Sequence, residues 1–394
     1  MQRPMTGLLA AALLVCACGP GIAARTAGTA HAAPGKWSLQ HTPDSSGRTL
    51  LSVSCASATA CAATGTTMAN GINRTVAETW HAAAWSLEPT PTIPGGTDGF
   101  LRGVSCPSAA SCTAVGDYSN GTANVTLAEG WNGTRWSIEP TPNPPGSRGN
   151  YLFGISCPAP RSCTAVGDFI ARTGAQMTLT EHWNGSAWSI QPTPKLPGHQ
   201  QGILFGVSCA APDACTAVGL SSMPSGASRT LAEAWNGSAW SIQATPNVPG
   251  AQLNSLAAVS CSAASACTAV GNDSASTSST LPLAEVRHGS AWSIQPTPNP
   301  PSAANTYLSG VSCTSATACT ASGYFVTHGR ADVSVAMGWN GSSWSIQHAV
   351  RPASAAASFL NGVSCTSAAD CTAVGDYTTG TPLQAALAER HSAG

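Results

Sequence analysis

The stretch "GKWSLQHTP", residues 35–43, has the form of the final segment of a repeat whose earlier segments do not precede it. Its core pattern is tryptophan, serine, an aliphatic residue, then glutamine or glutamate. This pattern returns with its tryptophan at Trp85, Trp136, Trp188, Trp240, Trp292 and Trp344. Every later copy follows a long segment that also repeats. The repeat array therefore starts out of phase with its own unit.

The segment that precedes each later copy contains Ser-Cys, five residues and a second cysteine, in seven copies whose first cysteines lie 51 or 52 residues apart. Internal periods of this length indicate a repeat architecture. Cysteines paired at constant spacing in an exported chain predict disulfides. A zinc site is the alternative, but zinc needs four ligands, whereas each copy supplies two cysteines and the nine histidines do not follow the repeat. The predicted pairs are Cys55/Cys61, Cys106/Cys112, Cys157/Cys163, Cys209/Cys215, Cys261/Cys267, Cys313/Cys319 and Cys365/Cys371.

Each copy is expected to form four short strands. In the fourth copy these are residues 204–209, 215–220, 229–235 and 240–245, with a tight Asn236-Gly237 turn before the last strand. Neither face of the first hairpin is polar, so the sheet must be covered on both faces. In the fourth strand Trp240 and Ile242 alternate with polar residues, which predicts a half-exposed outer strand. Radial stacking of such sheets gives an all-β propeller.

The phase shift predicts how the ring closes. A strand at residues 37–40 precedes the seven units, and the last unit stops after its third strand at residues 387–389. Pairing of these two strands would complete a seven-bladed β-propeller, whereas an open array would need polar caps. A β-solenoid or tandem sandwiches are the alternatives. The predicted domain is 33–394, with repeats starting near residues 50, 101, 152, 204, 256, 308 and 360.

Residues 1–32 have the features of an export signal: Arg3, an apolar run at residues 8–17, and Ala30-His31-Ala32 as a cleavage site. The alternative is a lipoprotein signal, because Val15-Cys16-Ala17-Cys18 resembles a lipobox that would anchor the protein through Cys18. No other apolar run has the length of a membrane span. We expect a monomer that is secreted or lipid-anchored outside the cell.

Charged residues make up 8% of the chain and the formal net charge is −1. Such a chain offers no basic stripe for a phosphate backbone, so nucleic acid is not an expected partner. No motif for a cofactor or metal is present. Glutamates recur two residues before the position of the first tryptophan of each pair, broken only by Met337; we expect them to accept backbone N–H groups from a neighbouring turn. They are Glu78, Glu129, Glu181, Glu233, Glu285 and Glu389.

The segments "GVSCxSxxxCTAVG" and "WNGSxWSIQPTP" resemble the secreted β-propeller repeat proteins of high-GC bacteria and, more distantly, Asp-box sialidase-like propellers. Where the Asp-box has an aspartate, this chain has Asn132, Asn184, Asn236 and Asn340 in a shorter turn. Sialidase chemistry is therefore not implied. Tryptophan pairs such as Trp235/Trp240 predict cross-strand packing, with a sugar-stacking platform as the alternative.

The loops between the second and third strands, and those joining the units, differ between copies and should share one face. Because binding residues are commonly carried on loops of a rigid scaffold, we expect glycan, cell-wall polymer or protein to bind there. A hydrolase or lyase with a site near the propeller axis is the alternative; no catalytic constellation supports an enzyme. The candidate contact residues are Tyr118, Phe169, Arg172, His199, Tyr324, His328 and Tyr377.

Overall fold

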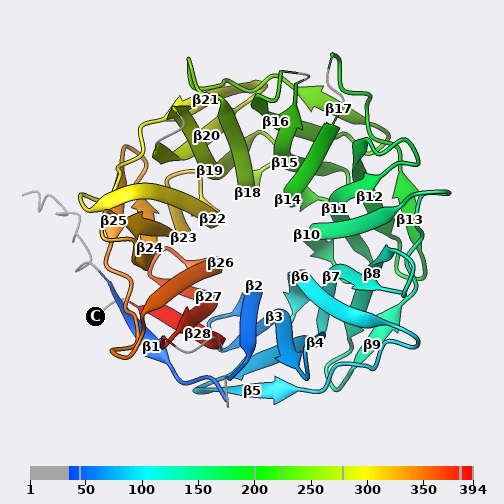
Figure 1. The fold of residues 1–394 in the computed structure, drawn as a ribbon, viewed down its shortest axis with the longest axis horizontal. Coiled ribbons are helices and arrows are strands. Elements are labelled where there is room, and N and C mark those ends of the chain that lie inside the picture. Colours follow the sequence, from blue (N-terminus) through cyan, green and yellow to red (C-terminus); the bar gives the residue numbers. More distant parts are fainter. Residues whose placement is uncertain are drawn as a thin grey trace, which may run out of the picture. The chain divides into compact units, whose positions relative to one another are not determined.

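The computed structural model describes residues 35–43, 46–198, 201–223, 225–276, 279–380 and 384–392. The predicted export signal and Cys18 lie outside these residues. The described chain contains 28 strands and no helix, and thus no helix that could cross a membrane. The strands form seven four-stranded blades around a central axis (Figure 1). The predicted propeller is confirmed.

Each blade runs outward from the axis in chain order, and blades one to seven begin at β2, β6, β10, β14, β18, β22 and β26. The innermost strands are β2 (Arg48–Ser57), β6 (Thr97–Ser108), β10 (Gly149–Ala159), β14 (Gln201–Ala211), β18 (Leu253–Ala263), β22 (Ala303–Ser315) and β26 (Ala357–Ser367). The second strands are β3 (Ala60–Ala69), β7 (Ser111–Ser119), β11 (Ser162–Ile170), β15 (Ala214–Ser222), β19 (Ala266–Ser276), β23 (Ala318–Thr327) and β27 (Asp370–Thr378).

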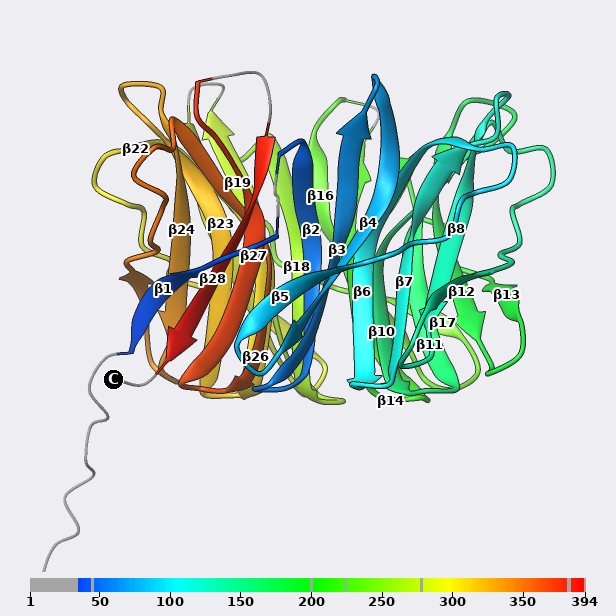
Figure 2. The ribbon, with the colours of Figure 1, turned by 90° about the horizontal axis from the view of Figure 1, so that it is seen from below.

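The third strands of the blades are β4 (Ile72–His81), β8 (Asn124–Trp131), β12 (Gln176–Trp183), β16 (Ser228–Trp235), β20 (Ser279–His288), β24 (Asp332–Trp339) and β28 (Gln384–Ser392). The outermost strands of blades one to six are β5 (Ala84–Glu88), β9 (Trp136–Glu139), β13 (Trp188–Gln191), β17 (Trp240–Gln243), β21 (Ala291–Gln295) and β25 (Trp344–Gln347). The cysteine hairpins lie at one end of the ring, and the loops that differ between copies lie at the other (Figure 2).

The ring closes through the out-of-phase strand. β1 (Lys36–Gln40) is the outermost strand of blade seven and pairs antiparallel with β28, with Leu39 opposite Glu389. The indole N–H of Trp37 donates to the side-chain oxygen of Gln347 in blade six, at 3.0 Å. An early segment and the last segment of the chain thus share one sheet, as the phase shift predicted.

Both faces of each sheet are covered by the neighbouring blades. In blade four Cys209 lies opposite Cys215, Val207 opposite Ala217 and Gly206 opposite Val218, as predicted. Val218 is fully buried and packs against blade five. The outermost strand departs from the prediction: it ends at Gln243, and Ile242 is 38% exposed. The reason is that Ile242 lies on the outermost strand, where the preceding blade covers Trp240 but leaves Ile242 exposed.

All seven predicted disulfides are present, one in each cysteine hairpin. The bonded pairs are Cys55–Cys61, Cys106–Cys112, Cys157–Cys163, Cys209–Cys215, Cys261–Cys267, Cys313–Cys319 and Cys365–Cys371. Each bridge joins the end of an innermost strand to the start of the second strand of the same blade. The bridges therefore staple hairpins within blades and do not link one blade to another.

The sequence did not distinguish the two cysteines of a pair, but the structure does. The second cysteine is buried in every blade, with an exposed fraction of 1–6%: these residues are Cys61, Cys112, Cys163, Cys215, Cys267, Cys319 and Cys371. The reason is that it lies on the second strand, against the preceding blade. In blade five, for example, Cys267 Sγ lies 3.6 Å from Thr216 Oγ1 of blade four. These seven residues therefore belong to the core of the scaffold and offer no surface to a ligand.

The serine before each first cysteine links neighbouring blades. Ser208 Oγ, for example, accepts the backbone N–H of Cys261 in blade five at 2.9 Å. The same bond joins every neighbouring pair of blades, including Ser364 to Cys55 across the closure. Each interface between blades therefore contains one hydrogen bond from a backbone N–H to a serine hydroxyl near this end.

Candidate ligand-binding site at the propeller axis

Every innermost strand contains a β-bulge at the same place. In β14 the pairing with β15 skips from Leu204 to Gly206, so that Phe205 has no partner. The leucine before the bulge is almost fully buried in every blade. A bulge inserts one residue and can re-aim its side chain. The seven bulged residues are Leu51, Arg102, Phe153, Phe205, Ala257, Ser309 and Asn361.

These seven residues, one from each blade, all line a single cavity of about 200 Å³ on the axis. The residues that follow each bulge keep the channel narrow. A Cβ added to Gly154 would lie 2.8 Å from the carbonyl oxygen of Phe205, so neighbouring backbones approach closely here. The flanking leucine and valine or isoleucine positions are nearly constant between blades, whereas the bulged residue changes in size and charge. The scaffold therefore does not require a particular residue type at the bulged position.

Arg102 is the only charged residue of the bulged set, and its charge is compensated within the protein. Its Nε forms a salt bridge with Oδ1 of Asp117, which is fully buried, while the arginine side chain is 29% exposed. Burial raises the pKa of Asp117, and the bond and charge of Arg102 oppose that rise. The guanidinium carbon lies 4.8 Å from the ring centre of Phe100 and 5.6 Å from that of Phe153. The arginine is thus held over aromatic faces.

Half-buried aromatic rings form two groups: Phe153 and Phe205 of the first line the cavity, and in the second Tyr307 and Phe359 occupy the position two residues before the bulged residue of their strands. The first arc comprises Phe100, Tyr151, Phe153 and Phe205 on blades two to four, where Tyr151 and Phe205 flank Phe153 with ring centres 6.3 and 5.7 Å away. The second arc comprises Tyr307, Tyr324 and Phe359 on blades six and seven. The ring centre of Tyr324 lies 5.0 Å from that of Tyr307 and 4.9 Å from that of Phe359. Within the described chain the three phenol hydroxyls have no hydrogen-bond partner, and none is buried.

Two carboxylates adjoin the first arc without reaching the channel. Asp117 on β7 and Asp168 on β11 occupy equivalent positions and both are fully buried. Burial raises the pKa of Asp168 to about 6, opposed by a hydrogen bond from Gln176 and increased further by Asp117. Burial and these two carboxylates also raise the pKa of Tyr151. A perturbed pKa is typical of catalytic acids, but a fully buried carboxyl group has no surface that could contact a substrate.

The structure does not bring the candidates from the sequence into one site. Tyr118, Phe169 and Tyr377 pack against the cores of blades two, three and seven. Tyr324 belongs to the second aromatic arc. Two further candidates, Arg172 and His328, are exposed in loops of blades three and six, and His199 lies outside the described residues.

The bulged residues lie on the innermost strands, outside the variable loops in which the sequence pattern predicts the contact residues. Their signal was nevertheless present in the sequence: a single variable position stands inside an otherwise constant segment, as in "LFGVSC" against "LRGVSC" and "LNGVSC". Sequence alone could not show the bulge itself. Without it, strict alternation would place this residue and the valine two positions later on the same side.

The recurring glutamates are sealed between blades, and each is fully buried. The prediction that they accept backbone N–H groups holds for Glu389, whose Oε2 accepts the N–H of Val350 at 2.9 Å. For the other five it is wrong, because no geometrically satisfactory hydrogen bond reaches their carboxyl oxygens. At the position equivalent to Val350 the other blades have proline, as at Pro194, and proline has no N–H to donate.

Desolvation by burial is the main influence on the pKa of these glutamates. It raises the pKa of Glu129, Glu181, Glu233 and Glu285 to about 8. The pKa of Glu389 rises only to about 7, because Val350 donates to it. Glu78 also stays near 7, since Arg48 Nη1 lies 3.6 Å from its carboxyl oxygen. No group of three or more His, Cys, Asp or Glu side chains suited to a metal ion occurs among the described residues.

The described chain is similar to solved β-propellers. One of them is the structure described as "YCF48 bound to D1 peptide". The match spans 92% of this chain and 96% of that one, at 12% sequence identity and a TM-score of 0.52. It matches the GH74 xyloglucanase from Xanthomonas campestris at 14% identity and a TM-score of 0.56, covering 88% of this chain but only 54% of that one. No protein-family model and no curated protein matches the sequence. At these identities the likeness shows the fold alone: the chain is a seven-bladed β-propeller.

Proposed function

We propose that the protein is an exported, non-enzymatic binding module whose ligand occupies the axial channel between the two aromatic arcs. The observation that carries this proposal is the bulge ring. In all seven blades the bulged residue lines the same cavity. Its side chain differs in size and polarity from blade to blade, whereas the residues on either side of it are nearly constant. A concave site lined by aromatic rings and a few polar groups is the usual form of a ligand pocket.

Export is supported by two independent features. The seven disulfides suit an oxidising compartment, since such bonds are rare in cytosolic proteins. The first 32 residues have the charged, apolar and cleavage regions of an export signal. Secretion and anchoring through Cys18 are distinguished by the mass of the mature N-terminus.

Binding without catalysis is supported by the burial of the carboxyl groups beside the channel. Asp117 is tied to Arg102, and Asp168 is fully enclosed. General acid catalysis requires the acid to reach the leaving group. Two of the solved propellers with a similar fold illustrate both classes: one is described as bound to a peptide and the other as a xyloglucanase.

The test is a binding screen on the oxidised protein against a glycan array and isolated cell walls, repeated with Phe205→Ala and with Arg172→Ala. Saturable binding that is lost in Phe205→Ala and retained in Arg172→Ala supports an axial site. Loss in Arg172→Ala alone would instead place the site on the loops. Turnover of a glycan without any accumulation of bound ligand would overturn the binding function.

A further inference from the structure

We propose that the ligand of the axial site is an uncharged glycan chain, which enters and leaves the channel mouth through the gaps between the two aromatic arcs. This inference rests on the proposed binding function and adds the ligand class and its path. Three properties of the site carry it: its charge, the placement of the arcs and the chemistry of the exposed groups.

The site offers no unpaired charge to a ligand. Arg102 is the only charged residue among the seven bulged residues, and Asp117 already compensates it at a fully buried position. Asn361, the other strongly polar member, donates to Asp376 at 3.1 Å and to the carbonyl of Leu50 at 2.9 Å. A formally charged ligand would lose its hydration here without gaining an ionic partner. An uncharged ligand avoids this cost.

Two blades on roughly opposite sides of the channel lack an aromatic ring at the positions that form the arcs. Blade five carries Ser255 and Ala257 at the positions where other blades carry aromatic rings, and blade one carries Thr49 and Leu51. In the ring, blades one and five stand between blades two to four and blades six and seven (Figure 1). Blades two to four carry the first arc, and blades six and seven carry the second. A ligand longer than the channel is wide can therefore extend beyond it in two directions, which suits a linear polymer.

The exposed groups match sugar rings better than an extended peptide. The arcs combine half-buried aromatic rings with three phenol hydroxyls, those of Tyr151, Tyr307 and Tyr324. A pyranose ring has an apolar C–H face that packs on an aromatic ring and a rim of hydroxyls that hydrogen-bond to phenols. A peptide would carry an N–H and a C=O at every residue, and three phenol groups cannot pair with all of them.

The experiment is calorimetric titration of the oxidised full chain with neutral hexasaccharides (cellohexaose, fully N-acetylated chitohexaose) and neutral cell-wall polysaccharide, against hexagalacturonate and an uncharged decapeptide pool. We expect binding to the neutral glycans only, with an affinity that changes less than about twofold between 50 and 500 mM salt. Phe205→Ala and Tyr307→Ala should each weaken binding about tenfold. Ala257→Trp fills the gap on blade five while removing no contact, and should weaken binding at least as much.

Arg172→Ala and His328→Ala, in exposed loops, are matched controls that should bind like the wild type. Melting curves of every variant identify those that fail to fold, and Ala257→Trp keeps the test informative if an aromatic deletion does. Binding of hexagalacturonate with a steep salt dependence, or of the peptide pool alone, would overturn the glycan inference but leave the binding function. Unchanged affinity in Ala257→Trp would overturn the path through the gap. Absence of binding to every probe and to isolated cell walls would overturn both proposals.

Discussion

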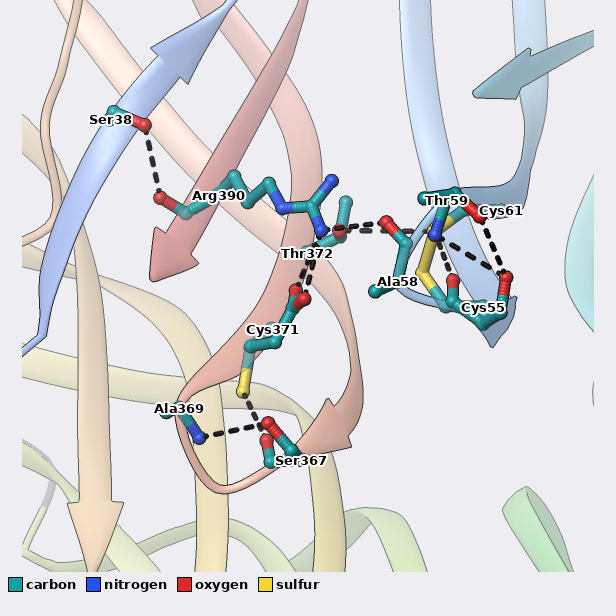
Figure 3. Close-up of polar contacts among 12 residues, drawn as sticks. Ser38, Cys55, Ala58, Thr59, Cys61, Ser367, Ala369, Cys371, Thr372 and Arg390 are labelled. Atoms are coloured by element: carbon teal, nitrogen blue, oxygen red, sulfur yellow. Dashed lines mark hydrogen bonds and ion pairs between the residues drawn. A yellow bond between two sulfur atoms is a disulfide. The ribbon is translucent and has the colours of Figure 1, made fainter. Parts of the chain in front are cut away.

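Arg390 on β28 forms a salt bridge with Asp370 on β27, in which Nη2 of the arginine lies 3.0 and 2.9 Å from the two carboxylate oxygens (Figure 3). The same Nη2 donates to the carbonyl oxygen of Ala58 at 2.6 Å. Ala58 belongs to the cysteine hairpin of blade one. The arginine therefore ties the last blade to the first, and its guanidinium carbon lies 5.6 Å from the ring centre of Trp80. In blade four the equivalent positions are Ala234 and Ala214. The interface between blades seven and one thus has a hydrogen bond from a charged side chain, which an ion pair within blade seven holds in place and which supplements the pairing of β1.

Asp370→Ala should lower the free energy of unfolding by about 1 kcal/mol, because it removes a two-oxygen contact from an arginine that remains partly exposed. The two side chains are 19% and 25% exposed, which limits the loss. Urea unfolding of the oxidised protein measures it. Asp213→Ala, in the exposed hairpin of blade four, is the matched control and should be nearly neutral. Equal losses of unfolding free energy in both variants would show that the contact of Asp370 with Arg390 does not stabilise the fold.

A chain that begins at residue 44 should be much less soluble than one that begins at residue 35. The shorter chain lacks β1 and leaves β28 as an unpaired edge, which invites pairing with other chains. It also exposes the core of blade seven that Trp37 covers. Size-exclusion chromatography and thermal melting compare the two chains. A monomeric short chain with an unchanged melting temperature would contradict the role of β1 in closure.

Stability should fall as the pH rises from about 5 to about 8. Burial raises the pKa of Glu233 to about 8 in the folded state, whereas the unfolded chain has an ordinary glutamate pKa near 4.5. Between these values the folded state binds more protons than the unfolded state, so the free energy of unfolding decreases with pH. The contribution is complete below the unfolded pKa and is lost through the folded pKa. Denaturant unfolding at several pH values measures the slope.

Glu233→Gln tests the origin of that slope. The amide cannot ionise, so this variant should lose less stability than the wild type between pH 5 and pH 8. Met337→Glu adds a carboxyl at the position where the series is naturally broken, and should lose more. Asp213→Asn, at an exposed position, should leave the slope unaltered. A slope that is identical in all four proteins would show that the buried glutamates do not control it.

Ser208→Ala should destabilise the protein by about 1 kcal/mol, because it leaves the backbone N–H of Cys261 without its 2.9 Å partner in the interface between blades four and five. Ser262→Ala removes a hydroxyl from an exposed side chain and serves as the control. Thermal unfolding of both variants with the disulfides intact separates this bond from the effect of the bridges. A neutral Ser208→Ala would indicate that water replaces the lost acceptor.

The tertiary structure corrected local details that follow from packing between blades. The sequence predicts a half-exposed outer strand with Trp240 and Ile242 on one face, but blade three covers only Trp240 and leaves Ile242 38% exposed. It predicts backbone donors for all six glutamates, but only Val350 has an N–H at the required place. Both errors concern what a neighbouring blade places opposite a residue. A repeat pattern describes one blade well and says little about the interface it forms with the next.

The sequence by itself determined the architecture: the period of the cysteine pairs sets seven blades, and the early tryptophan segment at residues 35–43 sets the manner of closure. The strands of one unit hydrogen-bond mainly to one another, so the pattern of one copy predicts the strands of all. Only the tertiary structure forms the cavity on the axis. Arg102, Phe153 and Phe205 lie about one repeat apart in sequence, and it is the bulge in each innermost strand and the circular arrangement that turn them into one channel.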